Sequence, residues 1–277
     1  MFSLIESLFT DPIWFLEYSL YRIPAVLIAM VLHEWAHGYA ALRCGDPTAL
    51  RMGRLTLNPL KHLDPLGAFF MFFMGFGWAK PVPVNASNFK RPRRDDLLVS
   101  VAGVTVNFLI FILSTLALVF LSRQLWQPWL FDMVPFQEVV GFQDCDAGSV
   151  FCGLRSDGSP FSILFAILGG NGPVFSSLNL FARPGLLWAV RLAGHVSLIN
   201  IGIAIFNLVP IPPLDGYHVL NDLVLKGNLF ASGQIANIGR LAVYVLMFTG
   251  VLGNAMNFAV NAIQGGLLRV VLPVFGG

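Results

Sequence analysis

Residues 23–42 read IPAVLIAMVLHEWAHGYAAL, and this stretch decides the class of the protein. About twenty consecutive residues, nearly all apolar, are enough for a helix that crosses the hydrocarbon core of a bilayer. The same stretch carries two histidines and a glutamate, and ionisable side chains are costly inside lipid unless they have a function. The sequence therefore predicts a transmembrane helix with a functional site in it.

The composition of the whole chain agrees with a membrane protein. Of its 277 residues, 56% are hydrophobic and only 12% are charged, whereas an ordinary soluble domain has about 25% charged residues. This balance argues against a soluble enzyme, a nucleic-acid binder and a disordered chain, and three cysteines are too few for a disulfide scaffold. We expect a protein that lies in the lipid bilayer and binds no nucleic acid.

Three further apolar stretches are long enough to span a membrane. They cover residues 97–121, 186–209 and 235–263. Residues 2–20 are apolar but are interrupted by acidic residues and a proline, which favours an interfacial helix or an incomplete span. The pattern predicts an all-α, multi-spanning transmembrane helix bundle. We expect the whole chain to form one membrane-embedded domain, with a core of about residues 23–263.

A short segment around residues 64–86 is expected to differ from the spans. Residues 64–79 read DPLGAFFMFFMGFGWA, which is apolar but too short to cross the bilayer and therefore predicts a re-entrant or interfacial segment. Residues 80–85, KPVPVN, alternate proline with other residues, which favours an extended backbone and excludes a helix. An extended segment of this kind can pair with a substrate as an added strand.

The distribution of charge predicts an orientation. Residues 43–63 and 80–96 contain four and five of the 17 lysines and arginines, and they flank a segment that does not cross. The positive-inside rule places both loops in the cytosol. Residues 123–182 carry five acidic and two basic residues and are expected to form a non-cytosolic loop with a partly apolar insertion. Cys145 and Cys152 in this region either pair in an oxidising compartment or remain free thiols.

The segment from His33 to His37 is an HExxH motif. Residues four apart on a helix share one face, so both imidazoles can reach one metal ion. A catalytic zinc site has three protein ligands and one open position, and Glu34 can take a proton from water there. The motif predicts His33 and His37 as metal ligands and Glu34 as a general base. A polar cluster that only packs helices is the alternative.

The third ligand must come from another part of the chain. Asp64 and Asp215 are the acidic residues close to the cytosolic ends of the spans with strongly apolar flanks. Asp215 lies in VPIPPLDG, residues 209–216, where prolines break the helix, and irregular backbone at membrane depth is tolerated where it lines a cavity. We assign Asp215, with Gly216 permitting a tight turn beside it. An ordinary helix-end carboxylate is the alternative, and His218 is a competing ligand.

Together, the HEWAH and NLVPIPPLDG motifs resemble those of the site-2 protease family of intramembrane zinc metalloproteases. The stretches GDPTALRMGRLTLNPLKHLDPLG and FGWAKPVPVN are similar to the short prokaryotic branch of that family. Other members carry a PDZ domain between the core helices or CBS domains at the C-terminus. We expect neither here, because residues 123–182 are short and partly apolar and the tail after residue 263 is short.

The resemblance implies a zinc metalloendopeptidase with one Zn²⁺ per chain, bound by His33, His37 and Asp215, with Glu34 as general base. Its expected partners are transmembrane protein substrates, which it would cleave near the cytosolic face in regulated intramembrane proteolysis. The implied location is a prokaryotic inner membrane, which the chain would cross several times with its active site towards the cytosol. Substrate selection would then rest on the membrane core or on partner proteins.

Two asparagines are further candidates through the same resemblance. The family's Ala-Gly-Pro-x-x-Asn motif reads Ala-Gly-Val-Thr-Val-Asn at residues 102–107, with Val104 in place of the proline. The resemblance suggests that Asn107 and Asn207 face the active site and bind the substrate backbone or the oxyanion. Hydrogen bonding between helices is an equally open role for both.

Two other functions are compatible with a metal-binding membrane protein. One is a catalytically inactive scaffold that holds membrane clients, and the intact Glu34 argues against it. The other is a divalent-metal transporter. Transporters commonly have broken helices in two repeated halves, and no such repeat is present in this sequence.

Overall fold

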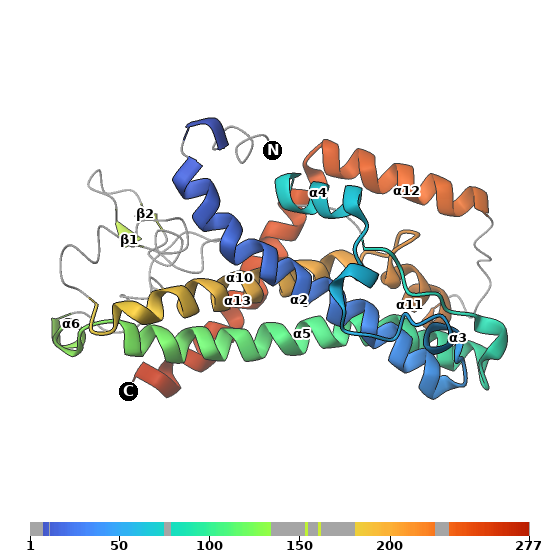
Figure 1. The fold of residues 1–277 in the computed structure, drawn as a ribbon, viewed down its shortest axis with the longest axis horizontal. Coiled ribbons are helices and arrows are strands. Elements are labelled where there is room, and N and C mark those ends of the chain that lie inside the picture. The colour runs from blue at the N-terminus through green and yellow to red at the C-terminus, as the bar shows by residue number, and fades with distance from the viewer. Residues whose placement is uncertain are drawn as a thin grey trace. The chain divides into compact units, whose positions relative to one another are not determined.

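The computed structural model describes residues 8–10, 12–74, 79–133, 153–154, 160–161, 181–224 and 233–276 (Figure 1). Its elements are α2 (Pro12–Cys44), α3 (Thr48–Arg51), η1 (Pro59–Lys61), α4 (Pro65–Met74), η2 (Ala86–Asn88), α5 (Pro92–Leu125), α6 (Pro128–Met133), β1 (Gly153–Leu154), β2 (Pro160–Phe161), η3 (Pro184–Leu186), α10 (Leu187–Asn207), α11 (Asp215–Leu223), α12 (Gly233–Phe248) and α13 (Val251–Gly276). Within these residues the fold is helical apart from the short antiparallel pair β1–β2, which confirms the predicted all-α class.

Four of the described helices are long and apolar enough to cross a membrane. These spans are Phe15–Cys44, Pro92–Leu125, Pro184–Asn207 and Val251–Val274. Their lengths, between 24 and 34 residues, exceed the roughly 20 residues that a bilayer requires. The predicted multi-spanning bundle is therefore confirmed.

The first span begins earlier than the sequence pattern indicated. α2 is one continuous helix from Pro12 to Cys44, so the prediction of a separate interfacial helix is wrong for residues 12–20. The acidic Glu17 interrupts the apolar pattern, but its carboxylate lies 3.1 Å from the guanidinium of Arg191 in α10. A charge that is paired within the bundle no longer prevents a segment from spanning.

The last span is also placed differently. The predicted span 235–263 is wrong, because the helix is interrupted between α12 and α13. Gly250 lies at this break with φ +76°, a left-handed conformation that glycine adopts without the steric cost of a side chain. The helix that can span the membrane therefore starts at Val251, beyond the break.

The chain divides into two compact units. One comprises Val26–Leu109 and Ile199–Met256, and the other comprises Phe2–Ala25, Ile110–Leu198 and Asn257–Gly277. All the predicted site residues belong to the first unit. The second unit has its own apolar core, whose fully buried members include Leu118, Leu125, Val190, Leu268 and Leu272.

Most of the predicted non-cytosolic loop lies outside the described residues, and so do Cys145 and Cys152. Their pairing stays a prediction.

The segment that was predicted to be re-entrant starts and ends at one place. Leu63 and Ala79 form an antiparallel bridge, and the Lys80 N–H donates to the His62 carbonyl at 2.8 Å. α4 lies between these two points in the sequence. A segment whose two ends meet cannot connect opposite faces of a bilayer, in agreement with the predicted re-entrant and extended segment.

A buried carboxylate ties the extended segment to the end of α2. Asp46 is completely buried and accepts hydrogen bonds from the Asn85 N–H at 2.7 Å and the Asn88 side-chain amide at 2.7 Å. It also accepts from the N–H and the hydroxyl of Thr48. Burial alone would raise the pKa of Asp46, but these donors hold it below its usual value. The carboxylate is therefore ionised at neutral pH and fixes the loop.

Replacing Asp46 with alanine is expected to lower the melting temperature by roughly 5–10 °C, because several buried donors lose their acceptor. Because the folded-state pKa is depressed, this stabilisation is present above about pH 4 and is lost as the pH falls through the lower folded value. Thermal denaturation in detergent, followed by circular dichroism, measures it. Asp64→Ala removes a carboxylate with one backbone donor, Gly67, and an equal loss there would contradict the account.

Candidate metal centre

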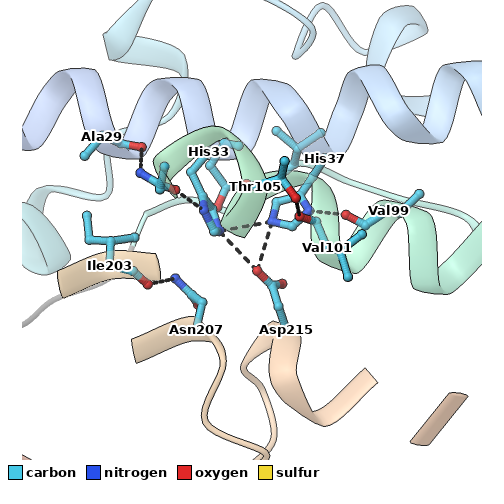
Figure 2. Close-up of polar contacts among 12 residues, drawn as sticks. Ala29, His33, His37, Val99, Val101, Thr105, Ile203, Asn207 and Asp215 are labelled. Atoms are coloured by element: carbon cyan, nitrogen blue, oxygen red, sulfur yellow. Dashed lines mark hydrogen bonds and ion pairs between the residues drawn. The ribbon is translucent and has the colours of Figure 1, made fainter. Parts of the chain in front are cut away.

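Three predicted ligands converge at one point. His33 and His37 lie one turn apart on α2, and their rings point toward Asp215, the first residue of α11 (Figure 2). The two Nε2 atoms are 3.0 Å apart. Asp215 Oδ2 lies 3.3 Å from each of them. Among the described residues, this is the one group of three or more metal-ligating side chains that can hold an ion.

The neighbours of the two imidazoles fix where their protons lie. His33 Nδ1 faces Asn107 Oδ1 at 2.6 Å, and His37 Nδ1 faces the Val99 carbonyl at 2.8 Å. Both partners are acceptors, so each Nδ1 carries a hydrogen and each neutral ring presents an Nε2 lone pair. Asp215 Oδ2 is buried and has no hydrogen-bond partner among the described residues. The two Nε2 nitrogens and Asp215 Oδ2 thus meet as three acceptors, with no hydrogen-bond donor between them.

This arrangement fits a zinc ion. Four ligands at about 2.0–2.1 Å in a tetrahedron lie about 3.3 Å from one another, close to the observed separations of 3.0 and 3.3 Å. Burial alone would raise the pKa of Asp215, but without a metal the imidazoles, once protonated, donate to it and hold that pKa well below its usual range. The residue therefore presents a carboxylate, and two neutral imidazoles with one carboxylate form a common ligand set for catalytic zinc.

A glycine on α5 makes room for both rings. A Cβ atom at Gly103 would lie 2.5 Å from His37 Nε2 and 2.7 Å from His33 Nδ1, closer than van der Waals contact allows. In the sequence, Gly103 stands out only as a member of the Ala-Gly-Val-Thr-Val-Asn motif. Its role depends on helix packing, which local sequence does not reveal.

Two other glycines position the loop that carries Asp215. A Cβ at Gly216 would lie 2.2 Å from the Leu208 carbonyl oxygen. Gly216 is not among the glycines with positive φ, so it permits the turn beside Asp215 by lacking a Cβ where α11 closely approaches the end of α10, and not by a left-handed backbone. A Cβ at Gly239 in α12 would lie 2.3 Å from the Pro212 carbonyl oxygen. α12 therefore packs directly against the proline-rich loop.

The predicted general base is held by the extended segment. Glu34 Oε2 accepts a hydrogen bond from the Val82 N–H at 2.7 Å. The Asn85 N–H is used by Asp46, and prolines have no N–H. Little donor capacity is therefore left in this segment for a substrate strand.

The competing ligands lie elsewhere. Asp64 Oδ1 accepts from the Gly67 N–H at 2.8 Å, where it caps the start of α4. His218 Nδ1 lies 3.1 Å from Asp96 Oδ2 on α5. Neither residue belongs to the cluster of ligand atoms.

The two asparagines differ from each other. Asn107 is completely buried, and its Nδ2 donates to the Ala29 carbonyl at 3.2 Å and to Asn200 Oδ1 at 2.8 Å. Its Oδ1 bonds to His33, so both ends of the Asn107 amide are engaged in hydrogen bonds to neighbouring helices. Asn207 is half-buried at the end of α10, and its Nδ2 donates to the Ile203 carbonyl of the same helix at 3.1 Å (Figure 2).

A second group of charges lies one to two turns beyond Asp215 on α11, at His218 and Asp222. Arg93 on α5 donates to the backbone carbonyl of Asp222 at 2.7 Å. Burial and the neighbouring Asp96 carboxylate raise the pKa of Asp222 to about 6. The hydrogen bond to Asp96 raises the pKa of His218. Protonation therefore favours the contact between α5 and α11.

Stability is expected to fall as the pH rises from about 4, the ordinary value of an aspartate, through about 6, the folded value of Asp222, and to fall further as His218 deprotonates above its ordinary value. Asp222 and His218 both have raised pKa values in the folded state, so each binds its proton more tightly there, and that stabilisation is lost as each deprotonates. Asp222→Asn removes one ionising group and should raise the melting temperature at pH 8 by roughly 2–4 °C, with a much smaller rise at pH 4, where the aspartate is largely protonated in both states. Melting curves at both pH values test this. An equal shift at both would contradict it.

The fold and the site define a class. A chain whose described part contains four helices apolar enough to span a membrane, and an HExxH glutamate beside a His–His–Asp cluster, is a membrane metalloprotease in its architecture. The chain matches the description "Peptidase family M50" over residues 21–250. It therefore belongs to peptidase family M50, the site-2 protease family. It is an integral membrane protein and a membrane-associated zinc metalloprotease.

Relatives with zinc metalloprotease names support the same assignment. YwhC of Bacillus subtilis is 32% identical over 266 residues, which are 94% of this chain and 97% of that protein. Rip2 of Mycolicibacterium smegmatis is 31% identical over 107 residues, 37% of this chain and 39% of its own length. No solved structure matches this chain.

Proposed function

We propose that this protein is an endopeptidase that hydrolyses peptide bonds within transmembrane segments of membrane-protein substrates, with one Zn²⁺ per chain. One observation carries the proposal: two Nε2 lone pairs and a carboxylate oxygen, within 3.3 Å of one another, meet without a donor. His33, His37 and Asp215 would hold the ion. Bound zinc supplies Lewis-acid chemistry that acidifies water and polarises a carbonyl.

Glu34 would move the proton. Its Oε2 accepts the Val82 N–H, which leaves Oε1 to take a proton from the attacking water. The same carboxyl group then passes that proton to the nitrogen of the leaving amine. The hydrogen bond to Val82 holds the carboxylate in one orientation during both transfers.

Substrate backbone would reach the site in an unwound form. A helix keeps its carbonyls in its own hydrogen bonds, so a transmembrane substrate must open locally before attack. Asn207 is the better candidate for a substrate contact, because its side chain is half-buried whereas Asn107 is fully buried. A substrate strand that pairs with the extended segment, residues 80–85, would bond mainly to the carbonyl groups of that segment and to the Val84 N–H.

The positive-inside rule supports an active site on the cytosolic side of a prokaryotic inner membrane. The HExxH motif lies in the C-terminal half of α2, close to the basic loop 43–63. Asp215 lies just after the C-terminal end of α10. By the same rule, this end of α10 is expected on the cytosolic side. Both positions favour cleavage near the cytosolic end of the substrate helix.

The test is cleavage in proteoliposomes. Purified protein is expected to contain about one zinc per chain and to cut a single-span reporter within its membrane segment, as located by mass spectrometry. His37→Ala should lose both zinc and cleavage. Zinc-loaded wild-type protein that leaves the reporter intact while binding it would favour a scaffold. Zinc flux into the vesicles would favour a transporter.

A further inference from the structure

Asn200 on α10 has no part in the metal cluster, yet it touches the residue that orients His33. Its Oδ1 accepts a hydrogen bond from Asn107 Nδ2 at 2.8 Å. Both asparagines are completely buried, so water cannot replace either partner. The two amides and the His33 ring form a chain of hydrogen bonds from α10 through α5 to α2.

The orientation of the Asn107 amide decides the chemistry of His33. With Oδ1 toward the ring, His33 Nδ1 carries the hydrogen and Nε2 keeps a lone pair for a metal. With Nδ2 toward the ring, Nδ1 must accept and Nε2 must carry the hydrogen. A rotation of this amide by half a turn would therefore remove one ligand from the site.

Two acceptors hold the Asn107 amide in the first orientation. The Ala29 carbonyl lies 3.2 Å from Nδ2 and Asn200 Oδ1 lies 2.8 Å from it. If the amide rotated, its oxygen would face both of these oxygens in a buried place, and each would lose its hydrogen bond from Asn107. Asn200 provides the shorter of the two contacts.

We propose that Asn200 is a positioning residue for the metal centre, which acts through Asn107 to keep the Nε2 lone pair of His33 directed at the ion. This inference rests on the proposed zinc site. Asn200 also links two ligands of the site. It lies on α10, the helix before the loop that carries Asp215, and it is connected through Asn107 to the imidazole of His33. Asn200 touches neither substrate nor metal in this role.

The test is the zinc affinity of purified variants, measured by chelator competition in detergent. Asn107→Leu should weaken zinc binding by about 10–100-fold. Asn200→Leu and Asn200→Ala both remove the acceptor but leave different volumes, and each should weaken binding by about 3–10-fold. In the Asn107→Leu background, the change at Asn200 should have no further effect, since its contact is already absent.

Ser197→Ala is the matched control. Ser197 is also a completely buried polar residue on α10, and its hydroxyl bonds to Thr115 on α5 at 2.7 Å. Its loss should leave zinc affinity unchanged. Gel filtration and melting curves identify any variant that does not fold, and the alanine variant then carries the test if the leucine variant fails.

Three outcomes decide the matter. Zinc bound by wild-type protein with unchanged affinity in both Asn200 variants would overturn the inference alone. Additive losses from Asn107 and Asn200 would also overturn it, because they would mean that Asn200 acts by another route. Wild-type protein that binds no zinc would overturn the proposed function and this inference with it.

Discussion

Glu34→Gln is expected to lower the rate of peptide hydrolysis by a factor of about 10²–10⁴ while zinc stays bound. The amide cannot take a proton from water, so the step assigned to the carboxylate is lost. Its carbonyl oxygen can still accept the Val82 N–H, which reaches the carboxylate at 2.7 Å. The extended segment should therefore keep its place.

Three measurements on one preparation separate chemistry from structure. Cleavage of the single-span reporter gives the rate, elemental analysis gives the zinc content, and circular dichroism gives the helix content. A variant that loses zinc together with activity would mean that Glu34 supports the metal site and is not only a base. Unchanged cleavage would remove Glu34 from the mechanism.

Gly103→Ala is expected to weaken zinc binding by about 100-fold or more, because one added methyl group displaces two ligands at once. The new Cβ would lie 2.5 Å from His37 Nε2. Neither ring can move away freely, since each is held at Nδ1 by Asn107 or Val99. The variant should retain its helices, because alanine favours a helix more than glycine does.

Gly202→Ala provides the comparison. Gly202 lies within α10, and a Cβ there would meet nothing within 4 Å. It should bind zinc like the wild-type protein and melt at the same or a slightly higher temperature. If both variants bind zinc normally, the close packing of α5 against the imidazoles does not exist in the protein.

The features that the sequence predicted correctly are local ones. A helical spacing of four residues brings His33 and His37 to one face, whatever the rest of the fold does. The prolines near Asp215 interrupt a helix by their own covalent structure. The apolar length of the spans follows from the thickness of the bilayer.

The features that the sequence missed depend on distant partners. Glu17 looks like an interruption of an apolar helix until Arg191 is known to lie beside it. The buried Asp46 depends on donors about 40 residues away. The break at Gly250 was missed because hydropathy continues across it, and only the backbone conformation ends the helix.

The residues of the metal centre also fall into those that local sequence predicts and those that depend on distant partners. The ligand residues follow from motifs, but the neighbours that orient them do not. The motif suggests a substrate contact for Asn107, whereas its side chain bonds to His33 and to groups on two neighbouring helices. Asn200 and Gly103 carry no chemical signal of their own, so only packing reveals what they do.

The contact between Gly239 and Pro212 has a practical consequence for work with the purified protein. α12 supports the loop that carries Asp215, yet it is a short apolar helix and exposes Ile238, Leu241 and Val245. The lipid or detergent that surrounds the protein therefore contacts α12 directly, and α12 supports the loop that carries the ligand Asp215. A micelle that loosens α12 would release the ion from a protein that is still folded, so zinc content reports on the choice of detergent as well as on the protein.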